Sequence, residues 1–107
     1  MQAADTDLHT AALCDVEIAA AFRRGILSRK LTTIRAADAI EDYLDLPLFR
    51  HGHQALLGRV LQLRSNFSAY DAAYVALAEQ LHGELLTADD GLARAVRTQL
   101  PLRLVLA

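Results

Sequence analysis

The sequence predicts an α/β fold in three layers, in which a short parallel sheet is flanked by helices. Short apolar strand candidates alternate with longer helical segments along the chain, and this alternation is typical of a parallel sheet covered by helices. The chain has 107 residues, of which 53% are hydrophobic and 22% charged. A chain of this size and composition can bury one core. We therefore expect a single domain over residues 1–107.

Apolar spacing, capping residues and glycines place the elements of the first half. They are a strand at Leu8-His9-Thr10, a helix from about Ala11 to Arg24, a helix capped by Thr32 or Thr33 that runs through Leu44, and a strand at 47–50. In the first helix Val16, Ile18 and Phe22 belong to a broad apolar surface. Gly25 is expected to end that helix.

The second half is expected to hold three further helices and two strands. They are a helix from about Gln54 to Ser65, a helix from Ala69 to His82, a strand at 84–87, a helix from Gly91 to Leu100 and a strand at 103–106. In the first of these helices most of the apolar residues should face inward, namely Leu56, Leu57, Val60, Leu61 and Leu63.

Charge and cysteine content restrict the classes of function. The net charge of −2 gives no overall attraction to nucleic acid or anionic membranes, so any nucleic-acid contact requires a local basic patch. The single cysteine, Cys14, cannot form an intrachain disulfide and lies in an apolar run, which fits a reducing, cytoplasmic compartment. No stretch approaches the roughly 18 apolar residues of a membrane span, and the first residues do not resemble a secretory signal.

Two acids stand where elements begin or end. Ser68 followed by Asp71 resembles a capping box and places Asp71 in the first turn of a helix, where the macrodipole favours a negative charge. Asp89 follows the strand at 84–87, at the sheet edge where ligands of open α/β sheets bind. Taken singly, either acid is more often a helix cap than a ligand.

Three blocks together carry a family resemblance. They are the segment from Asp15 to Arg24, the segment Tyr70-Asp71-Ala72-Ala73-Tyr74, and Thr87-Ala88-Asp89. In order and spacing they resemble the PIN domain, and among PIN proteins the VapC toxins of bacterial toxin–antitoxin operons. The resemblance extends from about Leu8 to Ala107.

The resemblance implies a function and a site. PIN toxins are endoribonucleases that use Mg²⁺ or Mn²⁺ held by acidic residues, and a partner antitoxin silences them. Matched residue by residue, the acids are Glu17, Asp71 and Asp89, with Thr87 as a supporting hydroxyl. Three carboxylates brought together repel one another, and a hard divalent cation relieves that repulsion. The reaction implied is hydrolysis of an RNA phosphodiester.

The chain departs from the PIN pattern at its start. PIN domains open with a central strand that carries the first acidic ligand, and this sequence has no counterpart of it. The sheet would then need direct pairing across the gap, a strand from a second copy or a partner chain, because a buried amide without a partner costs about 1 to 3 kcal/mol. A homodimer or a rearranged PIN fold is therefore expected.

Other residues and other functions stay open. Arg23, Arg24, Arg64 and Arg94 are candidate phosphate contacts, although solvated surface charge explains them equally well. The first alternative to a nuclease is a catalytically impaired PIN remnant that binds an antitoxin or dimerises. The second is a plain α/β domain whose acids are helix caps.

Overall fold

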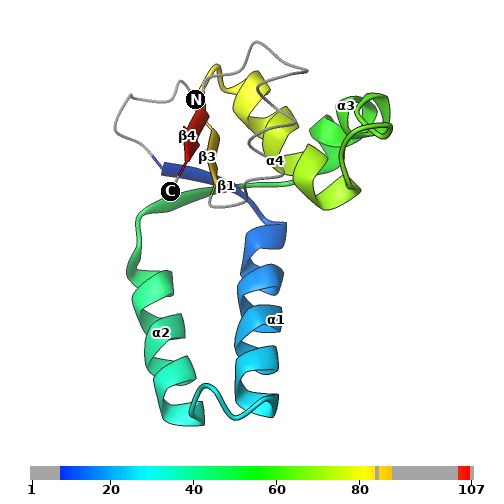
Figure 1. Ribbon diagram of the computed structural model, residues 1–107. Helices are drawn as coiled ribbons and strands as arrows, with labels where there is room; N and C mark the ends of the chain where they lie inside the picture. The colour runs from blue at the N-terminus through cyan, green and yellow to red at the C-terminus, as the bar shows by residue number, and fades with distance from the viewer. Residues whose placement is uncertain (1–7, 84, 88–103, 107) are drawn as a thin grey trace. The chain divides into compact units, whose positions relative to one another are not determined.

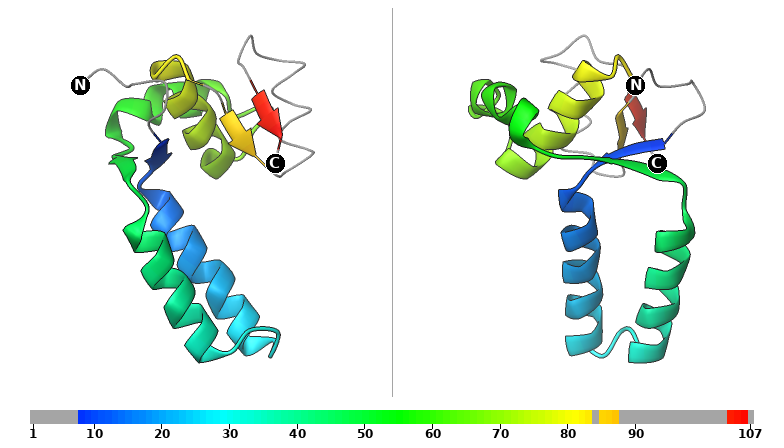
Figure 2. Two further views of the ribbon diagram at one scale, coloured as in Figure 1. Left: turned by 90° about the vertical axis from the view of Figure 1, so that its left-hand side faces the viewer. Right: turned by 180° about the vertical axis from the view of Figure 1, so that it is seen from behind.

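The computed structural model describes residues 8–83, 85–87 and 104–106. Among these residues, those up to Arg50 form one compact unit and those from His51 onward form a second. Each unit is described by itself below (Figures 1 and 2). The prediction of a single domain is not tested by this division and stays a prediction.

The N-terminal unit is a helical hairpin between two strands. Strand β1 (Leu8–Ala11) leads into helix α1 (Leu13–Leu27), and helix α2 (Thr33–Asp45) leads into strand β2 (Leu48–His51). The two strands pair in a two-stranded sheet, and the rings of His9 and Phe49 stack across it with their centroids 5.0 Å apart. Figure 1 shows α1 and α2 side by side, joined by a short turn.

The hairpin buries little. No residue of α1 is buried, and Ala36 is the one buried residue of α2. Val16, which the sequence places on a broad apolar surface, is 72% exposed. The apolar surface that the sequence predicts on α1 is therefore exposed at Val16.

The second unit is built around helix α4 (Ala69–Gln80). Six of its twelve residues are buried, and Val75 is fully buried in a cluster with Leu63, Phe67, Ala72 and Ala78. The small alanine side chains let α4 lie close to its neighbours, which are the 3₁₀ turn η1 (Gln54–Leu56), helix α3 (Leu57–Gln62) and strand β3 (Leu85–Thr87).

Strand β3 pairs in parallel with strand β4 (Leu104–Leu106). Leu85 lies opposite Leu104, and Thr87 lies opposite Leu106. The predicted α/β class, with a short parallel sheet flanked by helices, is confirmed. The predicted helix from Gly91 to Leu100 lies outside the described residues.

Two helix starts are as the sequence predicts. The Thr32 hydroxyl accepts a hydrogen bond from the Arg35 amide (3.2 Å), and the Ser68 hydroxyl accepts one from the Asp71 amide (3.1 Å). Each N-cap residue has extended backbone, as capping requires. The helix predicted from Gln54 to Ser65 is shorter, since η1 precedes it and α3 ends at Gln62.

Two of the leucines predicted to face inward on this segment are exposed. Leu57 is 59% exposed and Leu61 is 63% exposed, while Leu56 and Leu63 are buried. A helix this short packs only one side against α4, so that only some of its apolar residues reach the core.

The end of α1 differs from the prediction that Gly25 terminates it. Helix α1 continues through Gly25 to Leu27, and Arg29 takes the left-handed conformation (φ 61°) that closes the helix. The Arg29 amide donates to the Ile26 carbonyl and the Lys30 amide to the Gly25 carbonyl, which is a Schellman motif. Glycine at position 25 is favoured for a different reason, because a Cβ there would lie 3.1 Å from the Cβ of Leu31, a tight contact.

Helix α4 ends in the same way. His82 is left-handed (φ 51°) and its amide donates to the Glu79 carbonyl, while the Gly83 amide donates to the Ala78 carbonyl. A non-glycine residue in this conformation is strained by its Cβ. None of the described helices is long and apolar enough to span a membrane.

The substitution His82→Gly should therefore stabilise the protein. We expect the free energy of unfolding to rise by about 0.5 to 1 kcal/mol, because glycine adopts positive φ without strain. Urea denaturation followed by circular dichroism measures it. Gln80→Gly is the matched control and should lower stability by about 1 kcal/mol, since Gln80 has helical backbone. A loss of stability in both variants would contradict the left-handed backbone conformation of His82.

Candidate functional site

Asp71 is held at the start of the most buried helix of the chain's described part. It lies in the first turn of α4, half-buried, and its backbone amide is fixed by the Ser68 cap. The residues that follow it, Ala72 and Ala73, are buried. The carboxylate therefore stands on a rigid backbone in the turn where the helix macrodipole favours negative charge.

Glu17 is the second predicted acid. It lies in α1, one position after Val16, and its side chain is exposed. Glu17 and Asp71 belong to different units, and each is placed within its own unit. An exposed carboxylate is accessible to a hydrated cation, as Mg²⁺ binding requires.

The other two predicted residues fall at or beyond the end of β3. Thr87 is the last residue of β3, at the carboxyl end of a parallel strand, as the sequence predicts. Asp89 lies outside the described residues. Within the described ranges no three His, Cys, Asp or Glu side chains gather into a metal site, so the set of Glu17, Asp71 and Asp89 stays a prediction.

The donor chemistry of this set fits a hard divalent cation. All of its members supply carboxylate oxygens, the ligands that Mg²⁺ prefers. Softer metals such as zinc are held by cysteine and histidine in most sites, and neither residue type belongs to the set. A magnesium or manganese ion is therefore the group that these residues would hold.

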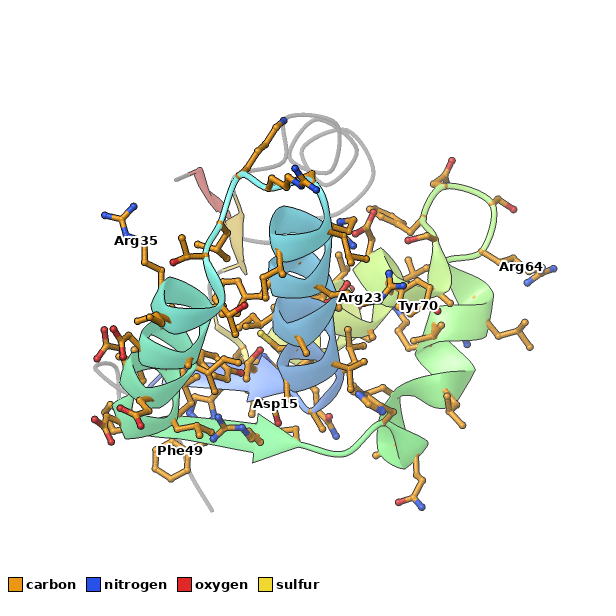
Figure 3. The ribbon with its side chains drawn as sticks, turned by 90° about the horizontal axis from the view of Figure 1, so that it is seen from below. Asp15, Arg23, Arg35, Phe49, Arg64 and Tyr70 are labelled. Carbon is orange, nitrogen blue, oxygen red and sulfur yellow. The ribbon has the colours of Figure 1, made fainter. Side chains whose placement is uncertain are left out.

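The other acid on α1, Asp15, has a role that the sequence analysis did not assign. The Tyr43 hydroxyl donates a 2.6 Å hydrogen bond to Asp15 Oδ1, and Arg50 Nε donates to both carboxylate oxygens at 2.9 and 3.1 Å. The Arg50 guanidinium also lies over the Tyr43 ring, 5.3 Å from its centroid. Figure 3 shows Asp15 where α1 begins, beside β2. The trio of Asp15, Tyr43 and Arg50 thus links α1, α2 and β2.

The electrostatics of this trio are mutually reinforcing. The hydrogen bonds from Tyr43 and then Arg50 lower the pKa of Asp15 below its ordinary value of 3.8. Burial, followed by the hydrogen bond to Asp15, raises the pKa of Tyr43, so the phenol stays protonated at neutral pH. The hydrogen bond to Asp15 raises the pKa of Arg50. Because Asp15 and Glu17 share α1, the trio fixes the helix that carries Glu17.

A second ion pair supports the helix that carries Asp71. Arg59 on α3 binds Glu79 on α4 through two parallel hydrogen bonds, Nε to Oε1 at 2.9 Å and Nη2 to Oε2 at 3.0 Å. Arg59 Nη1 also donates to Gln62 Oε1 at 3.2 Å. The hydrogen bond to Glu79 raises the pKa of Arg59. Such bidentate pairs are more specific in geometry than single contacts.

Sequence reasoning missed both ion pairs for one reason. Asp15 and Arg50 are 35 positions apart, and Arg59 and Glu79 are 20 apart. No local spacing rule connects residues at these separations, whereas helix pairs at three or four positions can be recognised.

Comparison with known proteins identifies the family. Ribonuclease VapC9 of Mycobacterium tuberculosis is 38% identical to this chain over 98 residues, which cover 92% of the chain and 77% of the relative. Ribonuclease VapC12 of the same organism is 34% identical over 88 residues, covering 82% of the chain and 68% of the relative. The chain belongs to the VapC family. No protein-family model matches it.

The sequence similarity to VapC proteins covers nearly the whole chain. A third relative, Ribonuclease VapC3 of M. tuberculosis, is 37% identical over 92 residues, covering 86% of the chain and 67% of the relative. The VapC resemblance that the three sequence blocks carry is thereby confirmed. The metal-ligand roles of Glu17, Asp71 and Asp89 are a separate matter and stay predictions.

Asp15→Asn should destabilise this VapC chain at pH 7 by removing the charge that Arg50 binds. A lowered folded-state pKa gives stability that is present above pH 3.8 and lost as the pH falls through the folded pKa. The difference in melting temperature between the parent and Asp15→Asn should therefore shrink from pH 7 to pH 3. Thermal melts at both pH values measure this.

Asp38→Asn is the control for that experiment, since Asp38 is an exposed acid on the same hairpin. It should change the melting temperature little at either pH. Equal effects of Asp15→Asn and Asp38→Asn at pH 7 would show that the trio does not stabilise the unit.

Proposed function

We propose that this protein is a metal-dependent endoribonuclease toxin of a VapBC-type toxin–antitoxin pair. It hydrolyses RNA phosphodiesters in the cytoplasm with Mg²⁺ or Mn²⁺ held by Glu17, Asp71 and Asp89. The observation that carries the proposal is the identity of 34 to 38% with proteins named VapC ribonuclease over most of their length. An antitoxin is its expected protein partner.

The described residues supply two supporting features. Asp71 stands in a capped first turn, so the backbone that carries its carboxylate is fixed before any ligand arrives. Glu17 is exposed on a helix that Asp15, Tyr43 and Arg50 hold in place. Preorganised carboxylates lose little conformational entropy when they bind a cation.

Each residue of the proposed site has a distinct task. Glu17, Asp71 and Asp89 hold the cation, and Thr87 lends a hydroxyl at the end of β3. When bound, the divalent ion supplies positive charge that orients and polarises the scissile phosphate and favours deprotonation of the attacking water. The free half-buried thiol of Cys14 is compatible with a reducing compartment.

Asp71→Asn tests the metal site. The variant keeps the Ser68 cap, which uses the backbone amide of residue 71, but loses the anionic ligand. Calorimetric titration of Mn²⁺ into the parent should show saturable binding. In Asp71→Asn we expect affinity to fall by at least a factor on the order of 10 to 100, which loss of a partner that only supports a ligand already causes. Asp38→Asn is the matched control and should bind as the parent does.

Cleavage of RNA is the second readout of the same variants. The parent and Asp38→Asn should cleave RNA when Mn²⁺ or Mg²⁺ is added and stop when it is chelated, and Asp71→Asn should be inactive. Metal binding that is equal in all three proteins would remove Asp71 from the site. A parent that is folded by circular dichroism and binds no Mn²⁺ would exclude the nuclease proposal for this chain.

A second candidate function rests on the exposed apolar surface of the hairpin. Large hydrophobic side chains of α1 and α2 are exposed, namely Val16 (72%), Leu27 (66%), Ile34 (76%) and Leu44 (63%). Four large exposed apolar side chains on so small a unit are available to a protein partner. In this alternative the chain is a catalytically impaired PIN remnant that binds an antitoxin or a second copy of itself.

The paired substitution Ile34→Ser with Leu44→Ser tests that surface. If the hairpin binds a second copy or the antitoxin, sedimentation of the purified chain, alone and with the antitoxin, should show loss of the complex in the variant. Leu57→Ser with Leu61→Ser is the control, because these residues are similarly exposed on α3. Complexes that persist in the hairpin variant, or that both variants lose equally, would contradict the assignment.

A further inference from the structure

The basic residues of the hairpin are concentrated in one stretch of sequence. From Ile18 to Ala37 there is no acid, although the whole chain has a net charge of −2. Five cations fall in this stretch, namely Arg23, Arg24, Arg29, Lys30 and Arg35. The acids of α2 begin only at Asp38, so the hairpin is basic at one end and acidic toward the other.

The fold places these five cations in and next to the turn that joins α1 and α2. Arg24 lies in the last turn of α1, Arg29 and Lys30 lie in the connecting turn, and Arg35 lies in the first turn of α2. Because a helix rises about 1.5 Å per residue, all five positions lie within about 6 Å of the helix ends along the axis. All five side chains are exposed, and Figure 3 shows Arg35 projecting from α2 on one side of the hairpin and Arg23 projecting from α1 on the other. We call these five residues the basic tip.

The cations of the basic tip differ from the other arginines of the described chain. Arg50 is paired with Asp15, and Arg59 is paired with Glu79. Arg64 donates to the Leu61 carbonyl of its own segment. No carboxylate of the described residues forms an ion pair with a residue of the basic tip. Within the described part of the chain, the positive charge of the basic tip is therefore accessible to an outside partner.

Two residues of the basic tip occupy positions where their residue type is locally unfavourable. Arg35 puts a cation in the first turn of α2, where the macrodipole disfavours positive charge and no acid compensates it. Arg29 occupies a left-handed position that glycine would fill without strain. Sites at which a sequence departs from local preference without a structural gain are often functional sites.

We infer that the basic tip binds the phosphate backbone of the RNA that the proposed function cleaves. This inference rests on that proposed function, which supplies RNA as the ligand. Four of the five cations are arginines, whose planar fork matches phosphate. Backbone contacts of this kind position a nucleic acid without reading its sequence. They also provide the local basic patch that a protein of net negative charge needs to bind RNA.

The test uses the triple variant Arg29→Gln, Lys30→Gln, Arg35→Gln. Binding of a fluorescein-labelled RNA stem-loop is measured by anisotropy, without added metal and in the Asp71→Asn background so that no cleavage occurs. We expect the affinity to fall on the order of tenfold, and the slope of log affinity against log salt to become shallower by about 2 to 3. Circular dichroism of each protein confirms that it is folded.

The control separates local contacts from overall charge. Adding Asp38→Asn, Glu41→Gln and Asp42→Asn to the triple variant restores the original net charge with exposed residues from the middle and second half of α2. If the basic tip acts locally, affinity should remain low. Recovery of affinity in this variant, or an unchanged affinity in the triple variant, would overturn the inference.

Two further outcomes distinguish this inference from the proposed function. Cleavage of the stem-loop is also measured with Asp71 intact, in the parent and in the triple variant. If both proteins cleave it with the same KM, the basic tip is not a substrate contact and the nuclease proposal stands. If the triple variant loses RNA binding while no metal-dependent cleavage is seen in the parent, the tip binds RNA and the nuclease proposal fails. Tip-dependent binding to phosphatidylserine vesicles without RNA binding would identify a membrane surface instead and overturn the inference.

Discussion

The packing of α4 into its unit is the constraint on which the position of Asp71 depends. Val75 is fully buried among Leu63, Phe67 and the alanines of the same helix, and burying a side chain of that size contributes about 1.5 to 3 kcal/mol. The Ser68 cap fixes the start of the helix, and the Arg59–Glu79 pair fixes its side against α3. A carboxylate in the first turn of such a helix has few alternative positions, as a preformed metal ligand requires.

The N-terminal unit is organised by polar contacts rather than by a core. Its helices bury almost nothing, and the trio of Asp15, Tyr43 and Arg50 joins three of its elements. A half-exposed ion pair contributes modestly to stability, so this unit is less strongly held within itself than the α4 unit. The same lack of burial leaves apolar side chains and the basic tip exposed on one hairpin. Leu27 and Ile34 of the apolar surface lie close to cations of the basic tip in the sequence, so the two proposed interactions use overlapping parts of the hairpin.

The family and the overall class of fold were predictable because their signals are either local or consist of sequence blocks in a fixed order and spacing. Thr32 and Ser68 cap helices through amides three residues away, and the strands at 85–87 and 104–106 follow from short apolar runs. The three blocks around Glu17, Asp71 and Asp89 were enough to indicate the VapC family, which the relatives establish. The end of α1 was predicted wrongly at Gly25, because a close contact with Leu31 and a helix terminator both favour glycine and the sequence does not distinguish them.

The sequence alone determined which residue types stand at the caps, the strand ends and the acidic positions of this chain, since each of those signals acts over three or four residues. The tertiary structure decided which charges are neutralised. It pairs Asp15 with Arg50 and Glu79 with Arg59 across 35 and 20 positions, and leaves the cations of the basic tip without a carboxylate among the described residues. It also decided that Leu56 is buried and Leu57 exposed. Pairing and burial depend on which segments meet in space, and no spacing rule within one segment contains that information.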